Sequence, residues 1–170
     1  MFVAVGVGAY STGMFHLTQQ LLPLLSRAAT PDDPARVINV ASYWAGDLDV
    51  SDPEFKRRRY NNHTAYRQSK QANRMLSAAF AERLQVAGVM VNACHPGDVN
   101  SQLSNDLGFG GSQSPDQGAD TPIWLATSPE VAGITGKYFE HRKEVICPFG
   151  SNREASRQLF ELCNGYTQSQ

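Results

Sequence analysis

Two short apolar runs, with a long helical segment between them, constrain the fold of this chain most strongly. Residues 36–41 and 89–94 are rich in β-branched side chains and are bounded by turn-forming residues, which is typical of buried strands. From about Thr64 to Val86 apolar side chains recur at helical spacing, and Gly88 is placed to end that helix. Strand, helix and strand in this order predict a parallel βαβ unit and an α/β fold.

Weaker patterns extend this unit in both directions. We expect one domain of about three strands with flanking helices, an irregular segment at its start and a frayed polar tail. Pro23 is expected to kink the first helix or to end one of its hydrogen-bonded turns. The expected ranges are a single domain over 1–170, an irregular segment over 1–9, helices over 11–27, 115–127 and 153–163, a third strand over 136–140 and a tail over 164–170.

Composition excludes several classes of function. A formal net charge of −1 gives no excess of positive charge for binding nucleic acid, and no apolar run approaches the ~18 residues of a membrane span. Three widely spaced cysteines are an odd number, which argues against a disulfide framework. We therefore expect a chain of the cytoplasm, with no nucleic-acid partner and no transmembrane segment.

A basic run, Lys56 to Arg59, lies inside a polar stretch over residues 47–63. Such a run can be a localisation signal or an anion-binding patch. Four acidic residues lie just before it, at positions 47, 49, 52 and 54, and they favour a solvated loop with balanced charge.

Tyr66 and Lys70 are the residues with the clearest chemical meaning. Side chains four apart share one helix face, so the phenol and the ammonium can act at one point. A nearby cation favours the phenolate form of a tyrosine, which makes the residue usable as a general acid and base. The same spacing also fits an ordinary pair on the surface of an amphipathic helix.

Polar residues follow both predicted strands. Ser42 comes just after the first strand, and residues 95–101 follow the second, at the edge where open α/β sheets bind ligands. A serine there can donate a hydrogen bond to a carbonyl oxygen on which charge develops. The His95-Pro96-Gly97 turn can expose backbone amides, and the Ser101 hydroxyl can bind a phosphate or a carboxamide.

At these residues the chain resembles the short-chain dehydrogenase/reductase family, in the branch that contains retinol dehydrogenases and the WW-domain-containing oxidoreductase. The resemblance runs from about Gly13 to about Phe139. Its motifs are the strand and serine of residues 37–42, Tyr66-x-x-Ser69-Lys70-x-Ala72-Asn73, and Val91-Asn92-x-x-His95-Pro96-Gly97-x-Val99-x-Ser101.

The resemblance implies a doubly wound, Rossmann-like parallel sheet, of which this chain holds the C-terminal part. It implies that Ser42 polarises a substrate carbonyl, that Tyr66 exchanges the proton, and that Lys70 supports Tyr66 and holds the nicotinamide ribose. Further cofactor contacts are implied for Pro96, Gly97, Val99 and Ser101. The cofactor is then NAD(P), with a slight preference for NADP, and the substrate is a small alcohol or carbonyl compound.

The sequence departs from the family pattern at its start. The Thr-Gly-x-x-x-Gly-x-Gly loop and the Asn-Asn-Ala-Gly strand are absent, and Tyr10 stands where the family carries a catalytic asparagine. We expect residues 1–7 to be replacement sequence that pairs beside the first strand. An alternative interpretation takes residues 2–13 as a strand, glycine loop and helix start, but Ser11 stands where the fingerprint requires glycine.

Other polar residues give weaker signals. The four histidines have no ligand spacing with each other or with the cysteines, so we expect no metal site. We expect His95 to be structural rather than catalytic, and Trp44 to pack in the core or at the rim of a site, with a substrate-pocket role as the alternative.

Three functions follow. The chain is an NAD(P)-dependent oxidoreductase with impaired activity, or a non-catalytic truncated family member that acts through binding as a homodimer or mixed oligomer, or an incomplete product without function. The sequence leaves open whether it is an active enzyme.

Overall fold

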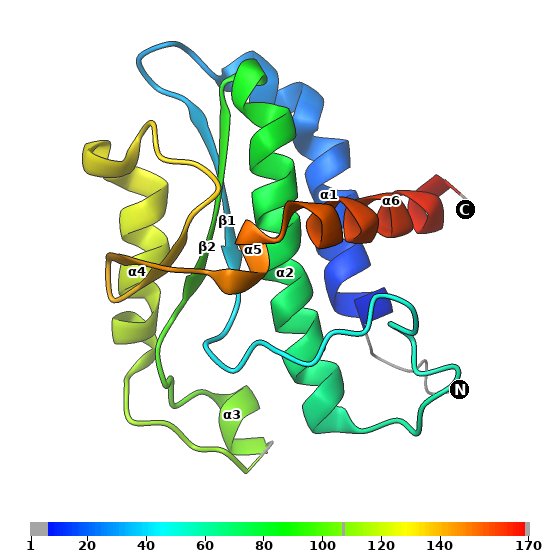
Figure 1. The fold of residues 1–170 in the computed structure, drawn as a ribbon. Coiled ribbons are helices and arrows are strands. Elements are labelled where there is room, and N and C mark those ends of the chain that lie inside the picture. Colours follow the sequence, from blue (N-terminus) through cyan, green and yellow to red (C-terminus); the bar gives the residue numbers. More distant parts are fainter. Residues whose placement is uncertain (1–6, 107, 169–170) are drawn as a thin grey trace.

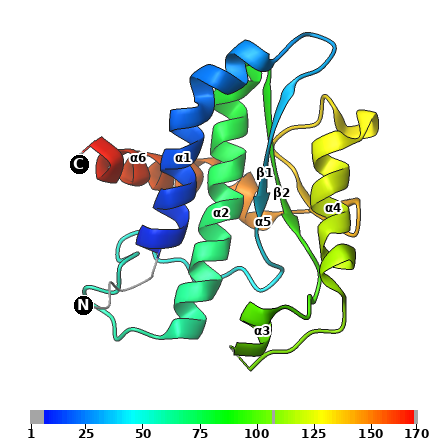
Figure 2. The same cartoon turned by 180° about the vertical axis from the view of Figure 1, so that it is seen from behind.

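The computed structural model describes residues 7–106 and 108–168 and has three layers (Figure 1). A sheet forms the middle layer. Helix α2 (Asn62–Leu84) packs on one face of the sheet, with α1 (Val7–Ala28) beside it on the same face and α6 (Arg153–Gln168) against both helices. Helix α4 (Pro115–Thr127) packs on the opposite face, as the reverse view also shows (Figure 2).

The sheet has four strands in the order β1-β2-β3-β4. Strands β1 (Ala35–Val40), β2 (Val89–His95) and β3 (Tyr138–Glu140) are parallel, with Val37 opposite Val91, so the predicted βαβ unit and α/β class are confirmed. Strand β4 (Lys143–Val145), which was not predicted, is antiparallel to β3. The carboxyl ends of β1 and β2 meet at one edge, which positions the candidate site.

Helix α2 is defined at both ends by local chemistry. The Asn61 side chain accepts a hydrogen bond from the Thr64 amide and caps the helix at its start. A short 3-10 turn, η1 (Gln85–Ala87), follows the helix, and Gly88 ends it with a φ of +71°. This left-handed conformation favours glycine, as the sequence pattern predicted.

Aromatic packing joins the three helices on one side of the sheet. The fully buried Phe15 of α1 lies 5.0 Å from Phe80 of α2 and 4.8 Å from Phe160 of α6, measured between ring centroids. Leu76 and Val91 complete this core between α2 and the sheet. The remaining short elements are α3 (Gln102–Asp106), η2 (Pro129–Val131) and α5 (Pro148–Ser151).

Both ends of the chain differ from the expectation. Helix α1 begins at Val7 and continues through Pro23, and Gly8 and Gly13 lie inside it. Residues 7–9, expected to be irregular, are therefore helical, and the alternative of a glycine loop fails where the structure describes it, because the chain is already helical from Val7. Residues 1–6, with the expected pairing beside β1, lie outside the described part. Residues 164–168, expected as a frayed tail, continue α6.

The basic run lies in a loop that is organised by a buried carboxylate. Asp52 accepts main-chain hydrogen bonds from Lys56, Arg57 and Arg58. Burial raises the pKa of Asp52, but these hydrogen bonds outweigh it, and the net shift is downward. Lys56 pairs with Glu54 and Arg58 with Asp52, as expected for a loop with balanced charge. Within residues 7–106 and 108–168, no helix combines the length and apolarity needed to cross a bilayer.

Candidate active site

A pocket of about 250 Å³ opens at the carboxyl ends of β1 and β2, beside α3. All of the predicted site residues line it, although they come from three separate parts of the chain. They are Ser42, Tyr66, Lys70, Pro96, Gly97, Val99 and Ser101. A larger hollow of about 490 Å³, between α2 and the β3–β4 hairpin, contains none of them.

Helix α2 presents Tyr66 and Lys70 to this pocket on one face. The Lys70 Nζ donates a hydrogen bond of 3.2 Å to the Val40 carbonyl and lies 5.7 Å from the centroid of the Tyr66 ring. An ammonium has three N–H donors, so donors remain for a ligand. Burial lowers the pKa of Lys70. Tyr66 is 42% exposed, and its ring is accessible from the pocket.

Ser42 follows β1 by two residues, and the main-chain hydrogen bonding to β2 continues past the end of β1 to Ala41. The Ala41 amide donates to the Cys94 carbonyl at 2.7 Å, which fixes the chain immediately before the serine. The Ser42 Oγ accepts a hydrogen bond from the Trp44 amide at 3.2 Å. No described residue accepts a hydrogen bond from the Ser42 hydroxyl, so its proton is available to an oxygen in the pocket.

The turn after β2 forms the opposite wall. Gly97 has a φ of +101°, a backbone conformation that residues with a Cβ rarely adopt, so the turn favours glycine. Val99 pairs with Gln113. The Ser101 Oγ accepts from the Ser104 amide at 3.1 Å and so caps α3, which engages the hydroxyl that was expected to bind a ligand.

An aromatic rim, defined as Tyr43, Trp44 and Phe109, was not predicted as a unit. The rings of Trp44 and Phe109 meet edge-on at 5.5 Å, and Tyr43 contacts His95 at 4.6 Å. Trp44 therefore lies at the rim of the site, which was one of the expected positions, and it also lines the pocket. Its position close after Ser42 is the sequence signal for this, whereas nothing local identified Phe109 within its glycine-rich loop.

Two further residues belong to the site: His95 in the lining of the pocket, and Arg74 beside the main chain of Ser42. The His95 side chain is 8% exposed, and its Nδ1 is buried without a partner among the described residues. Burial lowers the pKa of His95, which favours a neutral imidazole. Arg74 of α2 donates to the Ser42 carbonyl at 2.5 Å. It was not predicted, although its position four residues after Lys70 places it on the face of Tyr66 and Lys70.

Among the described residues, no group of three or more His, Cys, Asp or Glu side chains is arranged to hold a metal ion. The cysteines Cys94, Cys147 and Cys163 are all unpaired.

Comparison with known proteins establishes the family. Residues 9–108 match the short chain dehydrogenase family model, and the chain belongs to this family. It is 34% identical to human retinol dehydrogenase 13 over 90% of its own length and 50% of that protein. It is 32% identical to human polyprenol dehydrogenase over 78% of its own length and 44% of that protein.

Solved structures agree with this assignment. The fold matches an uncharacterised protein of Mycobacterium Paratuberculosis with a TM-score of 0.72 and 24% identity, covering 95% of this chain and 58% of that one. It also matches the RhlG/NADP active-site complex of Pseudomonas aeruginosa, with a TM-score of 0.62 and 27% identity, over 78% of this chain and 53% of that one. The Pseudomonas aeruginosa structure is described as a complex with NADP at its active site. The chain spans about half the length of the curated relatives it matches.

The residues that line the pocket have groups that would hold the nicotinamide end of such a cofactor. Lys70 keeps N–H donors, Ser42 keeps its hydroxyl proton, and Gly97 leaves the turn wall without a Cβ. Residues 7–13 are helical, so the part of the chain described before β1 supplies no glycine-rich phosphate loop. Tyr10, at the position of the family asparagine, lies in α1, and its side chain is outside the described part.

Proposed function

We propose that this chain is an NAD(P)-dependent oxidoreductase of the short-chain dehydrogenase type that acts on an alcohol/carbonyl pair. The observation that carries the proposal is the convergence of Ser42, Tyr66 and Lys70 on one pocket at the carboxyl ends of two parallel strands. A hydrogen-bond donor, a phenol and a cation in one site are the groups that proton exchange at a carbonyl oxygen requires.

Each side chain has a distinct role in the proposed mechanism. The Ser42 hydroxyl donates to the substrate oxygen and stabilises the negative charge that develops there during reduction. The Tyr66 hydroxyl gives its proton to that oxygen in reduction and takes it back in oxidation. The Lys70 ammonium stabilises the phenolate that remains. The nicotinamide, when bound, supplies or accepts the hydride.

For the cofactor, we assign the nicotinamide end to Lys70, Tyr66 and the main chain around Pro96, Gly97 and Val99. We give NADP a slight preference over NAD, which a 27% identical structure with NADP in its active site supports. Because the described residues provide no phosphate loop, we expect weak binding and impaired activity.

For the substrate, the aromatic rim favours a lipophilic alcohol or carbonyl compound, because such rings bury apolar surface at the mouth of the pocket. The names of the relatives, retinol and polyprenol dehydrogenases, describe substrates of this chemistry. We place the chain in the cytoplasm, a proposal that its three unpaired cysteines support.

Turnover by the purified chain tests the proposal directly. A panel of lipophilic aldehydes with NADPH should give slow oxidation of the cofactor. Tyr66→Phe should lower kcat by about a hundredfold or more, because the exchangeable proton is lost. Tyr60→Phe is the matched control, since Tyr60 is also exposed but contacts Phe55 outside the pocket. No turnover by folded wild-type protein, or equal turnover by Tyr66→Phe, would contradict the assignment.

A specific surface favours a second candidate, a binding function. Leu17, Leu21 and Leu24 lie on one face of α1 and are 58%, 39% and 54% exposed. A homodimer or a mixed oligomer with a longer relative would cover this stripe. Sedimentation should then show association that depends on concentration and is lost in Leu17→Glu/Leu24→Glu. A monomer at all concentrations, alone and mixed with such a relative, would exclude this candidate.

A further inference from the structure

We propose that Arg74 is a positioning residue that fixes the main chain of Ser42 and thereby holds the Ser42 hydroxyl in the pocket. Its effect on catalysis rests on the proposed function, whereas its effect on the position of the Ser42 turn does not.

The contacts of Arg74 support this role. The side chain is 7% exposed, and its Nη2 donates to the Ser42 carbonyl and to the Tyr138 Oη, both at 2.5 Å. The same carbonyl accepts from the Ala45 amide at 3.2 Å, closing a turn over residues 42–45. Charge-assisted hydrogen bonds to a fixed guanidinium are stronger and more directional than neutral ones. Arg74 therefore anchors the first residue of this turn.

Helix α2 carries Arg74 on the same face as the two proposed reacting residues of this helix. Tyr66, Lys70 and Arg74 follow one another at four-residue spacing, so they lie on one helix face. Lys70 holds the Val40 carbonyl and Arg74 holds the Ser42 carbonyl. The helix that carries the proposed proton donor thus also fixes, through two cations, the end of the strand that carries the proposed hydroxyl donor.

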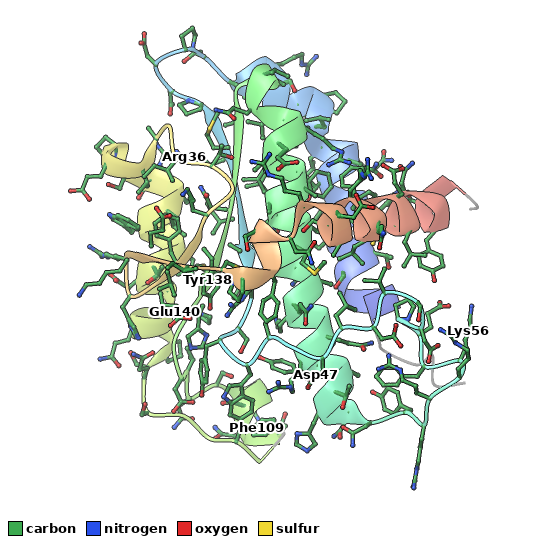
Figure 3. The ribbon with its side chains drawn as sticks, viewed as in Figure 1. Arg36, Asp47, Lys56, Phe109, Tyr138 and Glu140 are labelled. Atoms are coloured by element: carbon green, nitrogen blue, oxygen red, sulfur yellow. The ribbon has the colours of Figure 1, made fainter. Side chains whose placement is uncertain are left out.

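Strand β3 orients the guanidinium from the other side. Arg74 stacks on the Tyr138 ring, with its Cζ 3.5 Å from the ring centroid, and the Tyr138 hydroxyl donates to Glu140 at 2.8 Å. Figure 3 shows Tyr138 and Glu140 beside each other. Burial, together with the hydrogen bond to Glu140, raises the pKa of Tyr138 and keeps this hydroxyl protonated. Arg74 thus has one defined orientation.

A role in stability alone accounts less well for a buried arginine here. The Arg74 Nε is buried without a partner among the described residues, and the Nη2 lies 4.0 Å from Glu140. Desolvating an incompletely paired guanidinium costs free energy that an apolar side chain would not. An apolar side chain could not donate a hydrogen bond to the Ser42 carbonyl, as Arg74 does.

Fluorescence of Trp44 tests the positioning without requiring turnover. In a Trp124→Phe background Trp44 is the remaining tryptophan, and it lies in the turn that Arg74 anchors. Arg74→Met should raise quenching of Trp44 by acrylamide about twofold, because the turn opens locally. Arg83→Met is the matched control, since Arg83 also lies on α2 and stacks on an aromatic ring, that of Phe160, away from the pocket.

Kinetics then tests the consequence for catalysis. Arg74→Met should lower kcat about tenfold to a hundredfold, with the KM for the carbonyl substrate changed less than about threefold, because misplacement of a reacting group affects the transition state most. Arg74→Lys keeps the charge without the planar fork, so its kcat should lie between those of the wild type and Arg74→Met. If Arg74→Met does not fold, Tyr138→Phe, which keeps the ring and removes the orienting hydroxyl, should change quenching and kcat in the same direction.

The outcomes separate the two proposals. Unchanged Trp44 quenching in folded Arg74→Met, or an equal change in Arg83→Met, would overturn the positioning role. Unchanged kcat together with increased quenching would overturn the link to catalysis. If the wild-type chain shows no turnover, the proposed function fails, and the quenching comparison still decides whether Arg74 positions the turn.

Discussion

His95 shows how burial at the site controls a single side chain. The imidazole packs against Tyr43, and Glu140, His141, Arg74 and Asp98 all influence it electrostatically. Burial is the largest of these effects, and it lowers the pKa below the ordinary value of 6.5. The neutral form is therefore the one that the fold accommodates.

This shift predicts how stability depends on pH. Between the lowered pKa of the folded chain and 6.5, the unfolded chain binds more protons, so the free energy of unfolding falls as the pH drops through this window. Urea titrations at about pH 7.5 and about pH 5.5 should show this loss, and His95→Gln should show a smaller one. An equal loss in His95→Gln would mean that other groups cause the acid sensitivity.

At the residue scale, the sequence predicted what local spacing can encode. The four-residue helical spacing identified Tyr66 and Lys70 as neighbours. Ser42 and Gly97 were identified because each follows a predicted strand. Arg74 contacts Ser42, 32 positions away in the sequence, and Tyr138, 64 positions away. Local spacing cannot predict these contacts, because only the tertiary fold brings the residues together. The capping role of Ser101 was missed because α3 is too short to give a periodic signal.

At the scale of elements, the packing of α1 and α6 on α2 supports the helix that carries the site. Phe15→Ala should destabilise the chain by about 3–5 kcal/mol, because it leaves a cavity between two aromatic rings. Leu17 lies on the same helix, and its side chain is 58% exposed. Leu17→Ala should therefore change the free energy of unfolding by less than about 0.5 kcal/mol. Urea denaturation measures both. Similar losses in the two variants would show that the aromatic cluster is not the core of this layer.

The predictability of the elements follows the strength of their patterns. The strands β1 and β2 and the helix α2 were predicted because each has a long or strongly apolar pattern. The hairpin strand β4 has only three residues, all exposed, so no alternation distinguishes it from a loop. Helix α1 continues through Pro23, and its packing against α2 offsets the main-chain hydrogen bond that a proline cannot donate.

At the scale of the whole molecule, the chain combines three proposed reacting groups, Ser42, Tyr66 and Lys70, with about half of the length of the curated relatives it matches. In the proposed function, the described residues hold the nicotinamide end of a dinucleotide, and the helical residues 7–28 before β1 supply no phosphate loop for its other end. The central claim is therefore that the pocket recognises the nicotinamide and its ribose without help from the adenosine part.

A fluorescence titration of the purified chain with NADPH and with reduced nicotinamide mononucleotide tests this claim most directly. Both should bind saturably with similar affinity, at a Kd of about 1 mM, which corresponds to about −4.1 kcal/mol. Lys70→Met should weaken both, while circular dichroism shows that the variant is folded. Absence of binding for both compounds with folded wild-type protein, or binding that Lys70→Met leaves unchanged, would contradict the account.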